Sequence, residues 1–338
     1  MTLQERIDAF VALGRRIDRL SDAEFEELAF SVENNNSWFT PDHVKLALQG
    51  LVTMLDEEKV KSWIGRYDLP AVKKPKSVGV MMAGNIPAVG FHDLMMVLVS
   101  GHIAHVKLSS ADEVLIKWLV RELVEIAPAF AGQVVMEEML KAKDAYIATG
   151  SDNSARYFNY YFGKYPSVIR KNRTSVAVFD GSETAEDYRE LAKDIFQYFG
   201  LGCRNVSKVY VREQRQLKDF LTAIEGYNFV FSHHKYLNNY EYNKSIYLIN
   251  GDEHLDNGFL LCKQSEELVS PVAVLYYETY DDPEKLKELL ESQSEKIQCI
   301  VSRGRWYPSS VAFGEAQQPA IDDYADHVDT MAFLQRLS

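Results

Sequence analysis

Residues 77–108 read SVGVMMAGNIPAVGFHDLMMVLVSGHIAHVKL, and they establish the fold class. The apolar start predicts a strand, the segment GNIPAVG a turn, and the apolar stretch after it a helix. The run HIAHVKL then predicts a second strand, so the whole stretch is typical of a βαβ unit. A longer helix from Asp112 towards Ile126, followed by the strand AYIATG at 145–150, extends a mostly parallel sheet.

A second series of alternating helices and strands starts near Gly181 and continues to about Arg303. One helix there carries apolar residues along a single face, and a turn then leads into the strand SKVYVRE at 207–213. Ahead of both series, residues 1–68 show helical patterns, including a capping-box signature at Ser21–Glu24. The sequence therefore predicts an α/β fold with two interlocked Rossmann-like domains and a helical N-terminal lead-in.

The composition limits the possible functions. The chain has 338 residues, 46% of them hydrophobic and 25% charged, which suits about two globular domains. A formal net charge of -12 repels phosphate backbones and argues against nucleic acid as a partner. No apolar run approaches the roughly 20 residues that span a bilayer, and the start MTLQERIDAF lacks a secretion signal, so we expect a cytoplasmic protein. The three cysteines show no CxxC or Cys/His spacing, which predicts reduced thiols and no metal site.

One cysteine, Cys203, lies in YFGLGCRNVSKVYV at 198–211, between a glycine pair and a strand. Cysteine is most often a buried core residue, and Cys262 and Cys299, both in strand-like runs, are interpreted in that way. A glycine-lined turn between a helix and a strand is instead where catalytic groups are commonly presented, so Cys203 is a candidate nucleophile. The preceding helix points its negative end towards the sulfur, which disfavours a thiolate and which Arg204 could offset.

A thiol nucleophile needs a hydrogen-bond donor for the negative charge that develops on the carbonyl oxygen it attacks. Asn85 in GNIPAVG follows a parallel strand and could point its side-chain amide at that charge. Asparagine after glycine also serves to tolerate an unusual backbone angle in a turn. On the residues alone, both interpretations of Asn85 stay open.

A short basic cluster, formed by Arg170, Lys171 and Arg173, lies between the two series of strands and helices. Such a cluster could bind the phosphates of coenzyme A. Short runs of charge are more often solvated faces, and we favour that interpretation here.

In chain order, the segments AGNIPAVG, VKLSS, IATGS, GLGCRN and EELVSPV resemble the signature segments of the aldehyde dehydrogenase superfamily. Within that superfamily, YFGLGCRNVSKVYV and the C-terminal stretch FGEAQQPAIDDYADHVDTMAFL look like the acyl-CoA reductase branch of the LuxC type. The similarity covers most of the chain from about Ser77 onward. It implies that Cys203 is the nucleophile and that Asn85, with the backbone N–H of Cys203, forms the oxyanion hole.

The same resemblance implies a set of cofactor-binding residues. Lys107 stands where the superfamily places the lysine that holds the adenosine ribose, and Glu267 matches the carboxylate that holds the nicotinamide ribose. Gly150 and Ser151 match the turn that faces the cofactor pyrophosphate, where a helix N-terminus favours an anion. Ser270 departs from the glycine usual after the Glu267 position.

Two further departures from the superfamily pattern bear on the reaction. Ile169 in IRKNRTS stands near the position of the general-base glutamate of hydrolytic aldehyde dehydrogenases, so an acyl-enzyme here would resist water. Ser110 stands where NAD-preferring relatives commonly place a glutamate against the ribose 2′-hydroxyl. Because serine can donate to a 2′-phosphate, NADPH is favoured. Ser110 could also be only the N-cap of the helix that follows, a role compatible with the first.

These features predict an acyl-CoA reductase that uses NADPH to convert a fatty acyl thioester, of coenzyme A or of a carrier protein, to the aldehyde through an acyl-Cys203 intermediate. The resemblance implies a cofactor-binding domain formed by residues 1–180 with 309–338 and a catalytic domain formed by residues 181–308. It also implies a long acyl chain, a homo-oligomer and an acyl-activating partner enzyme.

Two other functions remain open on the sequence. One is a hydrolytic NAD(P)-dependent aldehyde dehydrogenase. The other is a noncatalytic acyl-binding or scaffold subunit. This alternative stays open because the chain is shorter than typical members of the superfamily. The joint presence of Cys203, Asn85, Lys107 and Glu267 argues against a scaffold, which has no use for all four residues.

Overall fold

The computed structural model describes residues 1–69, 72, 74–150 and 152–337, and the chain divides into two compact units. Unit 1 comprises Met1–Asn172 and Ala320–Ser338, and unit 2 comprises Arg173–Pro319. The sequence placed these divisions near residues 180 and 309. The first division lies earlier in the structure because the strand that begins at Thr174 pairs with strands of unit 2.

Unit 1 is built on a five-stranded sheet with the strand order β3-β2-β1-β4-β5, in which each described pair of neighbours is parallel. The predicted βαβ unit is confirmed, because β1 and β2 run parallel in register from Ser77↔Ile103 to Met81↔Lys107. The strands are β1 (Ser77–Met81), β2 (Ile103–Lys107), β3 (Val134–Met136), β4 (Ala145–Thr149) and β5 (Ser167–Arg170). The helices are α1 (Leu3–Asp18), α2 (Asp22–Asn35), α3 (Pro41–Met54), α4 (Glu57–Ile64), α5 (Phe91–Val99), α6 (Glu113–Ile126), η1 (Pro128–Gly132), α7 (Asp152–Phe162), η6 (Ala325–His327) and α12 (Thr330–Gln335).

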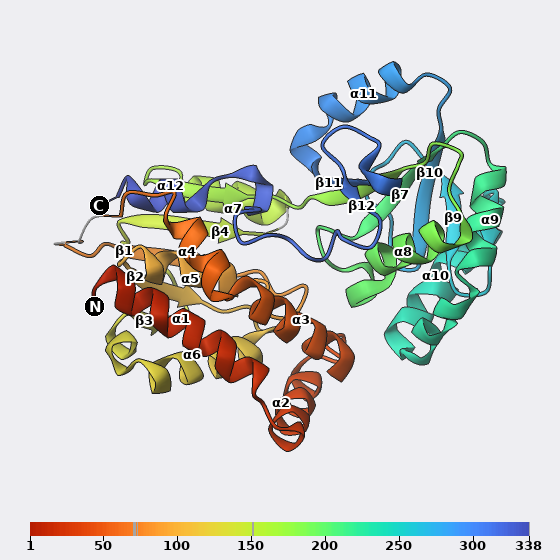
Figure 1. The fold of residues 1–338 in the computed structure, drawn as a ribbon. Helices are drawn as coiled ribbons and strands as arrows, with labels where there is room; N and C mark the ends of the chain where they lie inside the picture. The colour runs from red at the N-terminus through yellow and green to blue at the C-terminus, as the bar shows by residue number, and fades with distance from the viewer. Residues whose placement is uncertain (70–71, 73, 151, 338) are drawn as a thin grey trace. The chain divides into compact units, whose positions relative to one another are not determined.

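Alternate residues of a strand point to opposite sides of the sheet, and the two faces of this sheet pack against different helices (Figure 1). Val78 and Val80 of β1 belong to the large core that includes α1, α5 and α6. Tyr146 of β4 belongs instead to the smaller aromatic cluster with Phe162 of α7, whose ring centroid lies 4.1 Å away. The sheet is therefore covered on both sides, as parallel sheets generally are.

The helical lead-in shares the main core of unit 1. Phe10 of α1 is fully buried and makes edge contacts with Phe91 and Phe130, at centroid distances of 6.2 and 5.7 Å. The predicted capping box is present, since Glu24 accepts from the Ser21 backbone N–H at 2.8 Å and Ser21 Oγ accepts from the Glu24 N–H. These helices consequently pack with the strands as part of one folding unit.

Unit 2 is built on a seven-stranded sheet with the order β12-β11-β6-β7-β10-β9-β8, parallel except at the β8–β9 pair. Figure 1 shows α8 and α11 on opposite sides of this sheet. The strands are β6 (Thr174–Val178), β7 (Val206–Val211), β8 (His254–Asp256), β9 (Leu261–Gln264), β10 (Val274–Thr279), β11 (Ile297–Ser302) and β12 (Val311–Ala312). The helices are α8 (Ala185–Phe196), η2 (Gln197–Gly200), α9 (Arg215–Ala223), η3 (Glu225–Ser232), α10 (His234–Asn250), α11 (Pro283–Ser292), η4 (Ser294–Lys296) and η5 (Arg303–Arg305).

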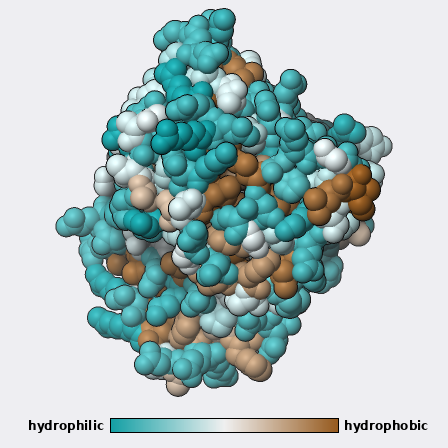
Figure 2. Space-filling model, turned by 90° about the vertical axis from the view of Figure 1, so that its right-hand side faces the viewer, coloured by the Kyte–Doolittle hydropathy of each residue, from teal (hydrophilic) through white to brown (hydrophobic). Residues whose placement is uncertain are grey.

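The tyrosine- and asparagine-rich segment forms α10. Tyr236, Tyr240 and Tyr247 lie on its buried side, whereas Tyr242 and Ile249 are exposed. Figure 2 shows a surface that is mainly hydrophilic, with hydrophobic residues gathered in separate patches. Across the described residues, no helix has both the length and the apolar character that crossing a bilayer requires.

Candidate active site

Three loops of unit 1 carry most of the residues expected to bind a cofactor. They follow β1, β2 and β4, which are neighbours in the parallel sheet and therefore end at the same edge. Asn85 follows β1, Lys107 ends β2 with Ser110 three positions later, and Gly150 follows β4. The carboxyl edge of an open parallel sheet is the usual ligand-binding edge of such folds. The structure thus brings these four residues to one edge.

Asn85 is exposed on the loop between β1 and α5. Two contacts fix this loop against the segment that follows β2. A Cβ atom added at Gly84 would collide with the Ser109 side chain, so only glycine fits there. Ala88, in the left-handed conformation with φ 59°, donates its backbone N–H to Asp112 Oδ2 at 2.8 Å. The turn that presents Asn85 is therefore held by residues outside its own segment.

Asp112 is an ionisable residue that the sequence did not single out for this loop. Its side chain is 2% exposed, and burial raises its pKa to about 8, partly offset by the N–H of Ala88. The α6 helix begins at Glu113, so its N-cap is Asp112 and not Ser110. The interpretation of Ser110 as the helix N-cap is therefore wrong, because the chain makes one more turn before the helix starts.

The loop that carries Ser110 is also held by the end of α2. Asn35 Nδ2 donates to the carbonyl of Ser110 at 3.0 Å, and Asn36 Nδ2 donates to the carbonyl of Ala111 at 3.2 Å. The Ser110 residue itself is exposed. The lead-in helices therefore help to define the position of the residue that we expect to face the cofactor ribose.

Gly150 occupies a position where a side chain would not fit. A Cβ atom added there would lie 2.8 Å from the ring of Phe158 and 2.9 Å from Ser154 Cβ, both on α7. The absence of a side chain lets the end of β4 approach the first turn of α7, which begins at Asp152. Ser151, the other residue expected at this turn, lies outside the described residues. The N-terminus of α7 next to Gly150 suits a phosphate group.

Cys203 lies in unit 2, in the turn that joins η2 to β7, and it is partly exposed. The chain turns sharply just before it, because Tyr198 and Phe199 both have positive φ angles of 54° and 55°. The carbonyl of Cys203 accepts from Ser175 Oγ at 3.1 Å. The structure thus gives Cys203 the expected setting, ahead of a strand and in a turn anchored by a buried polar residue.

The Asn205 side chain makes several hydrogen bonds around this turn. Its Oδ1 accepts from the Gly202 N–H at 2.8 Å, and its Nδ2 donates to the carbonyls of Asp194 and Gln197, each at 2.9 Å. Sequence reasoning missed Asn205 although it is two residues from Cys203, because its partners are not visible in the sequence pattern.

The other two cysteines differ from one another. Cys262 is fully buried on β9, as expected of a core residue, and burial raises its pKa well above the ordinary value. Cys299 on β11 is partly exposed, and its Sγ lies 3.0 Å from Ser175 Oγ. The interpretation of Cys299 as an ordinary core residue is wrong, since it is partly exposed in the first half of β11 and shares Ser175 with the Cys203 turn.

Residues of the C-terminal part of unit 2 also reach this turn. Asp194 of α8 accepts from the backbone N–H groups of Gly314 and Ala316, at 2.7 and 3.0 Å, while Arg204 Nε donates to the Ala316 carbonyl. Burial raises the pKa of Asp194 to about 7 despite these bonds. Residues 314–316 are therefore fixed beside the helix that leads to Cys203.

Glu267 is exposed in the segment between β9 and β10. The carbonyls on both sides of it are held by the first residues of β7: Ser207 Oγ donates to Leu268 at 2.6 Å, and Lys208 Nζ donates to Glu266 at 3.0 Å. This brings the Glu267 segment to the end of β7 that follows Cys203. A cavity of about 30 Å³ nearby is lined by residues that include Gly200 and Ser270. It has room for water but not for an acyl chain.

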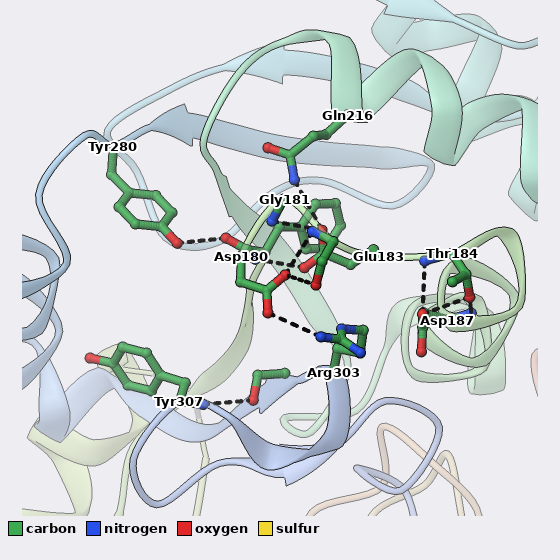
Figure 3. Close-up of polar contacts among 12 residues, drawn as sticks. Asp180, Gly181, Glu183, Thr184, Asp187, Gln216, Tyr280, Arg303 and Tyr307 are labelled. Carbon is green, nitrogen blue, oxygen red and sulfur yellow. Dashed lines mark hydrogen bonds and ion pairs between the residues drawn. The ribbon is translucent and has the colours of Figure 1, made fainter.

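A polar cluster lies just after the carboxyl-terminal ends of β6 and β11 (Figure 3). Cys203 instead precedes the amino-terminal end of β7. Arg303 contacts Asp180 at 3.4 Å, and Glu183 accepts from the N–H groups of Asp180 and Gly181. Gln216 donates to the second oxygen of Glu183 at 3.0 Å. Burial raises the pKa of Glu183. These contacts close the turn after β6, which gives the cluster a structural role.

The comparisons with known proteins agree with this architecture. The family model described as acyl-CoA reductase (LuxC) matches residues 15–226, which is more than half of the chain. The search of curated proteins finds no match.

Solved structures of aldehyde dehydrogenases share the fold. A Mycobacterium tuberculosis aldehyde dehydrogenase in complex with NAD+ is 12% identical with a TM-score of 0.64, over 89% of this chain and 73% of that chain. The P. syringae indole-3-acetaldehyde dehydrogenase AldA is 12% identical with a TM-score of 0.65, over 92% and 74%. Aldehyde dehydrogenase 21 of Physcomitrella patens is 11% identical with a TM-score of 0.62, over 99% and 89%.

The fold class expected from the sequence is thus confirmed: helical N-terminal segments come first in the chain, and the structure has two α/β units. The family match also makes the chain an oxidoreductase, which removes the noncatalytic scaffold as an alternative. This chain belongs to the LuxC family of acyl-CoA reductases.

Proposed function

We propose that this protein uses NADPH to reduce a long-chain fatty acyl thioester to the aldehyde through an acyl-Cys203 intermediate. One observation carries the assignment of the nucleophile. Of the three cysteines, Cys203 alone falls inside the segment that matches the family model, whereas Cys262 and Cys299 lie beyond its end at residue 226. Its turn is also anchored by Ser175 and Asn205, which favours a defined position for the sulfur.

The residues of unit 1 suit a nicotinamide cofactor. Support comes from the close approach of Gly150 to α7, which leaves a backbone surface at a helix N-terminus for a pyrophosphate. The solved structures of the M. tuberculosis and P. syringae proteins contain NAD+ on the same fold. In this proposal Lys107 holds the adenosine ribose, Ser110 faces the 2′-phosphate, and Glu267 holds the nicotinamide ribose. The cofactor, when bound, supplies the hydride.

The first stage is acyl transfer to the protein. The Cys203 thiolate attacks the thioester carbonyl, and the Asn85 side-chain amide donates to the oxygen that becomes negative. The tetrahedral adduct collapses by breaking its bond to the sulfur of coenzyme A, which departs as a thiolate. Because a thiolate is a stable leaving group, this step needs little help from a general acid.

The second stage returns the enzyme to its starting form. Addition of hydride to the acyl-Cys203 carbonyl gives a thiohemiacetal alkoxide, which Asn85 stabilises in the same way. The alkoxide reforms a carbonyl and breaks the bond to Cys203, so the aldehyde leaves and the thiolate is restored. Each stage therefore uses one nucleophile and one oxyanion donor.

Resistance of the intermediate to water follows from the residue at position 169. Ile169 on β5 cannot accept a proton, so it cannot activate a water molecule for attack on the acyl-cysteine. The alternative, a hydrolytic aldehyde dehydrogenase, requires a base at or near this position. The two functions therefore differ in the lifetime of the acyl-enzyme.

Mass spectrometry tests the proposal directly. The protein is mixed with a series of acyl-CoAs in the absence of reductant, and we expect one acyl adduct that maps to Cys203 and is lost in Cys203→Ser. Cys262→Ser is the matched control and should label normally, because that thiol is buried. The adduct should persist in buffer and be discharged by coenzyme A or by NADPH with release of aldehyde. Labelling at Cys299 would overturn the nucleophile, and rapid release of free fatty acid without thiol would favour the hydrolytic alternative.

A further inference from the structure

The position of Cys203 raises an electrostatic problem. Helix α8 runs towards the turn that carries Cys203, so its C-terminal end, which holds a partial negative charge, faces that turn. Carbonyl groups of the last helical turn have no partner within the helix. Negative partial charges near a thiol favour the protonated form, which is a poor nucleophile. Hydrogen bonds from other residues to these carbonyls would therefore favour a reactive Cys203.

Asn205 provides such hydrogen bonds. Its two Nδ2 hydrogens serve the carbonyls of Asp194 and Gln197, at the end of α8 and the start of η2, both at 2.9 Å. Its Oδ1 accepts from the Gly202 N–H at 2.8 Å, next to Cys203 in the chain. One side chain thus ties the end of the helix to the turn that presents the sulfur.

The remaining polar atoms of Asn205 fix it in place. Its backbone N–H donates to the Gly202 carbonyl at 3.0 Å, and its own carbonyl accepts from the Ser175 N–H at 3.2 Å. The residue is 2% exposed. A buried amide with all of its donors and acceptors paired has one defined orientation, so the bonds to the helix carbonyls are persistent.

We propose that Asn205 is a positioning residue that keeps Cys203 reactive by binding the carbonyls at the end of α8 and holding the Cys203 turn. The proposal rests on Cys203 as the nucleophile. Asn205 does not touch the reacting atoms. It acts through Gly202, which fixes the turn, and through the Asp194 and Gln197 carbonyls, whose negative partial charge it offsets.

Asn205→Asp is the sharpest test, since it keeps the shape and the acceptor but replaces two donors by a second acceptor with negative charge. Asn205→Ser, which keeps one hydroxyl donor without adding charge, is the milder variant in case the first does not fold. Asn243→Asp is the matched control. Asn243 is also buried in unit 2 and also donates to two backbone carbonyls, those of Asn239 and Val272, at 2.9 and 3.0 Å.

The readout is the rate at which iodoacetamide alkylates Cys203 as a function of pH, followed by peptide mass spectrometry. Asn205→Asp should slow alkylation at pH 7 about tenfold or more, which corresponds to an upward move of the titration midpoint by about one pH unit. Asn205→Ser should show a smaller change in the same direction. Asn243→Asp should alkylate within about twofold of the parent, although it is also less stable.

Other ionisable groups around the turn stay the same in each variant, which makes the comparison specific. They include Asp194 on α8, Arg204 in the turn, Lys208 on β7, Glu267 before β10, Cys299 on β11 and His233, whose ring centroid lies 4.4 Å from that of Phe199 in η2. Cys299 alkylation is mapped in the same samples. Its rate should not follow that of Cys203.

An unchanged midpoint in a folded Asn205→Asp or Asn205→Ser protein would overturn the proposal, as would an equal shift in Asn243→Asp. Failure of the proposed function gives a different result: the unmodified protein would not acquire an acyl group on Cys203 from acyl-CoA, whatever its rate of alkylation. The KM for NADPH should stay unchanged in the Asn205 variants, because none of the described hydrogen bonds of Asn205, which include those to Asp194, Gln197, Gly202 and Ser175, goes to Glu267.

Discussion

Arg170 and Asp93 form a buried ion pair in which one guanidinium nitrogen, Nη1, lies 2.8 Å from Oδ1 and 2.7 Å from Oδ2 of the carboxylate. Arg170 Nη2 also donates to Thr330 Oγ1 at 2.7 Å. The three side chains come from β5, α5 and α12, so the pair joins the last strand of the first sheet to the C-terminal helix. Arg170 is 3% exposed and Asp93 is 7% exposed. The interpretation of Arg170 as part of a solvated basic face is therefore wrong.

Removal of one member of this pair should destabilise the protein strongly. We expect Arg170→Ala to lower the free energy of unfolding by about 3–5 kcal/mol, because it leaves the Asp93 carboxylate buried without its cation. Arg66→Ala is the matched control: its pair with Asp322 is exposed, so its loss should change the free energy of unfolding far less. Urea denaturation of both variants gives the comparison. Equal losses would contradict the importance of burial.

Asp112 should make stability depend on pH. Its ordinary pKa is 3.8 and burial raises this to about 8, so between these values the folded protein holds a proton that the unfolded chain has released. Stability from this group is therefore complete below about pH 4 and is lost as pH rises towards 8. Asp112→Asn should remove that loss, with a gain on the order of 5–6 kcal/mol at pH 8.5 and almost none at pH 4. The urea midpoint at both pH values is the measurement, and a gain that does not grow with pH would rule out the buried carboxylate as its cause.

Asn85→Ala should lower turnover by roughly a hundredfold to a thousandfold, because the developing oxyanion loses its side-chain donor. Steady-state kinetics with a saturating acyl-CoA measures this, and an unchanged circular dichroism melt shows that the fold is kept. Turnover within a few fold of the parent would instead make Asn85 a turn residue. That result would leave the proposed role of Cys203 intact.

Ser110 should set a preference for NADPH over NADH. Ser110→Glu is expected to erase or reverse this preference, because a carboxylate repels the 2′-phosphate and accepts from a 2′-hydroxyl. Ser110→Gln, which has the same shape without the charge, is the control and should have a smaller effect. The kcat/KM values for the two cofactors decide the matter, and equal values in the unmodified protein would remove the role proposed for Ser110.

Ile169→Glu should speed the release of free acid from acyl-Cys203. A positioned base typically contributes about 10² to 10⁴ in rate, and in the proposed match to hydrolytic relatives the substitution places a carboxylate near the position of their general base. Ile169→Gln, which cannot act as a base, should leave the adduct as stable as in the parent. Loss of the acyl group is followed by intact mass. Equal lifetimes in the two variants would mean that residue 169 does not face the intermediate.

Much of the local structure was predictable from the sequence. The βαβ unit at 77–108 follows from the alternation of apolar runs and glycine-bounded turns, and the capping box at Ser21–Glu24 appears as expected. Cys203 could be located ahead of β7 because glycines and a strand-like run bracket it. These features depend on residues close together in the chain, where propensity and hydrophobic period act directly.

Contacts between distant segments could be decided only by the tertiary structure. No local sequence pattern predicts that Arg170 is buried against Asp93. The same holds for the contact of Cys299 with Ser175 and for the bond by which Asp112 holds the loop of Asn85. A charged or polar side chain has the same local signal whether it is solvated or paired inside a core, because burial and partners depend on how the sheets and helices pack. Asn205 is the clearest example. The sequence shows that it lies two residues after Cys203, but its hydrogen bonds to the end of α8 form only when that helix packs against β7.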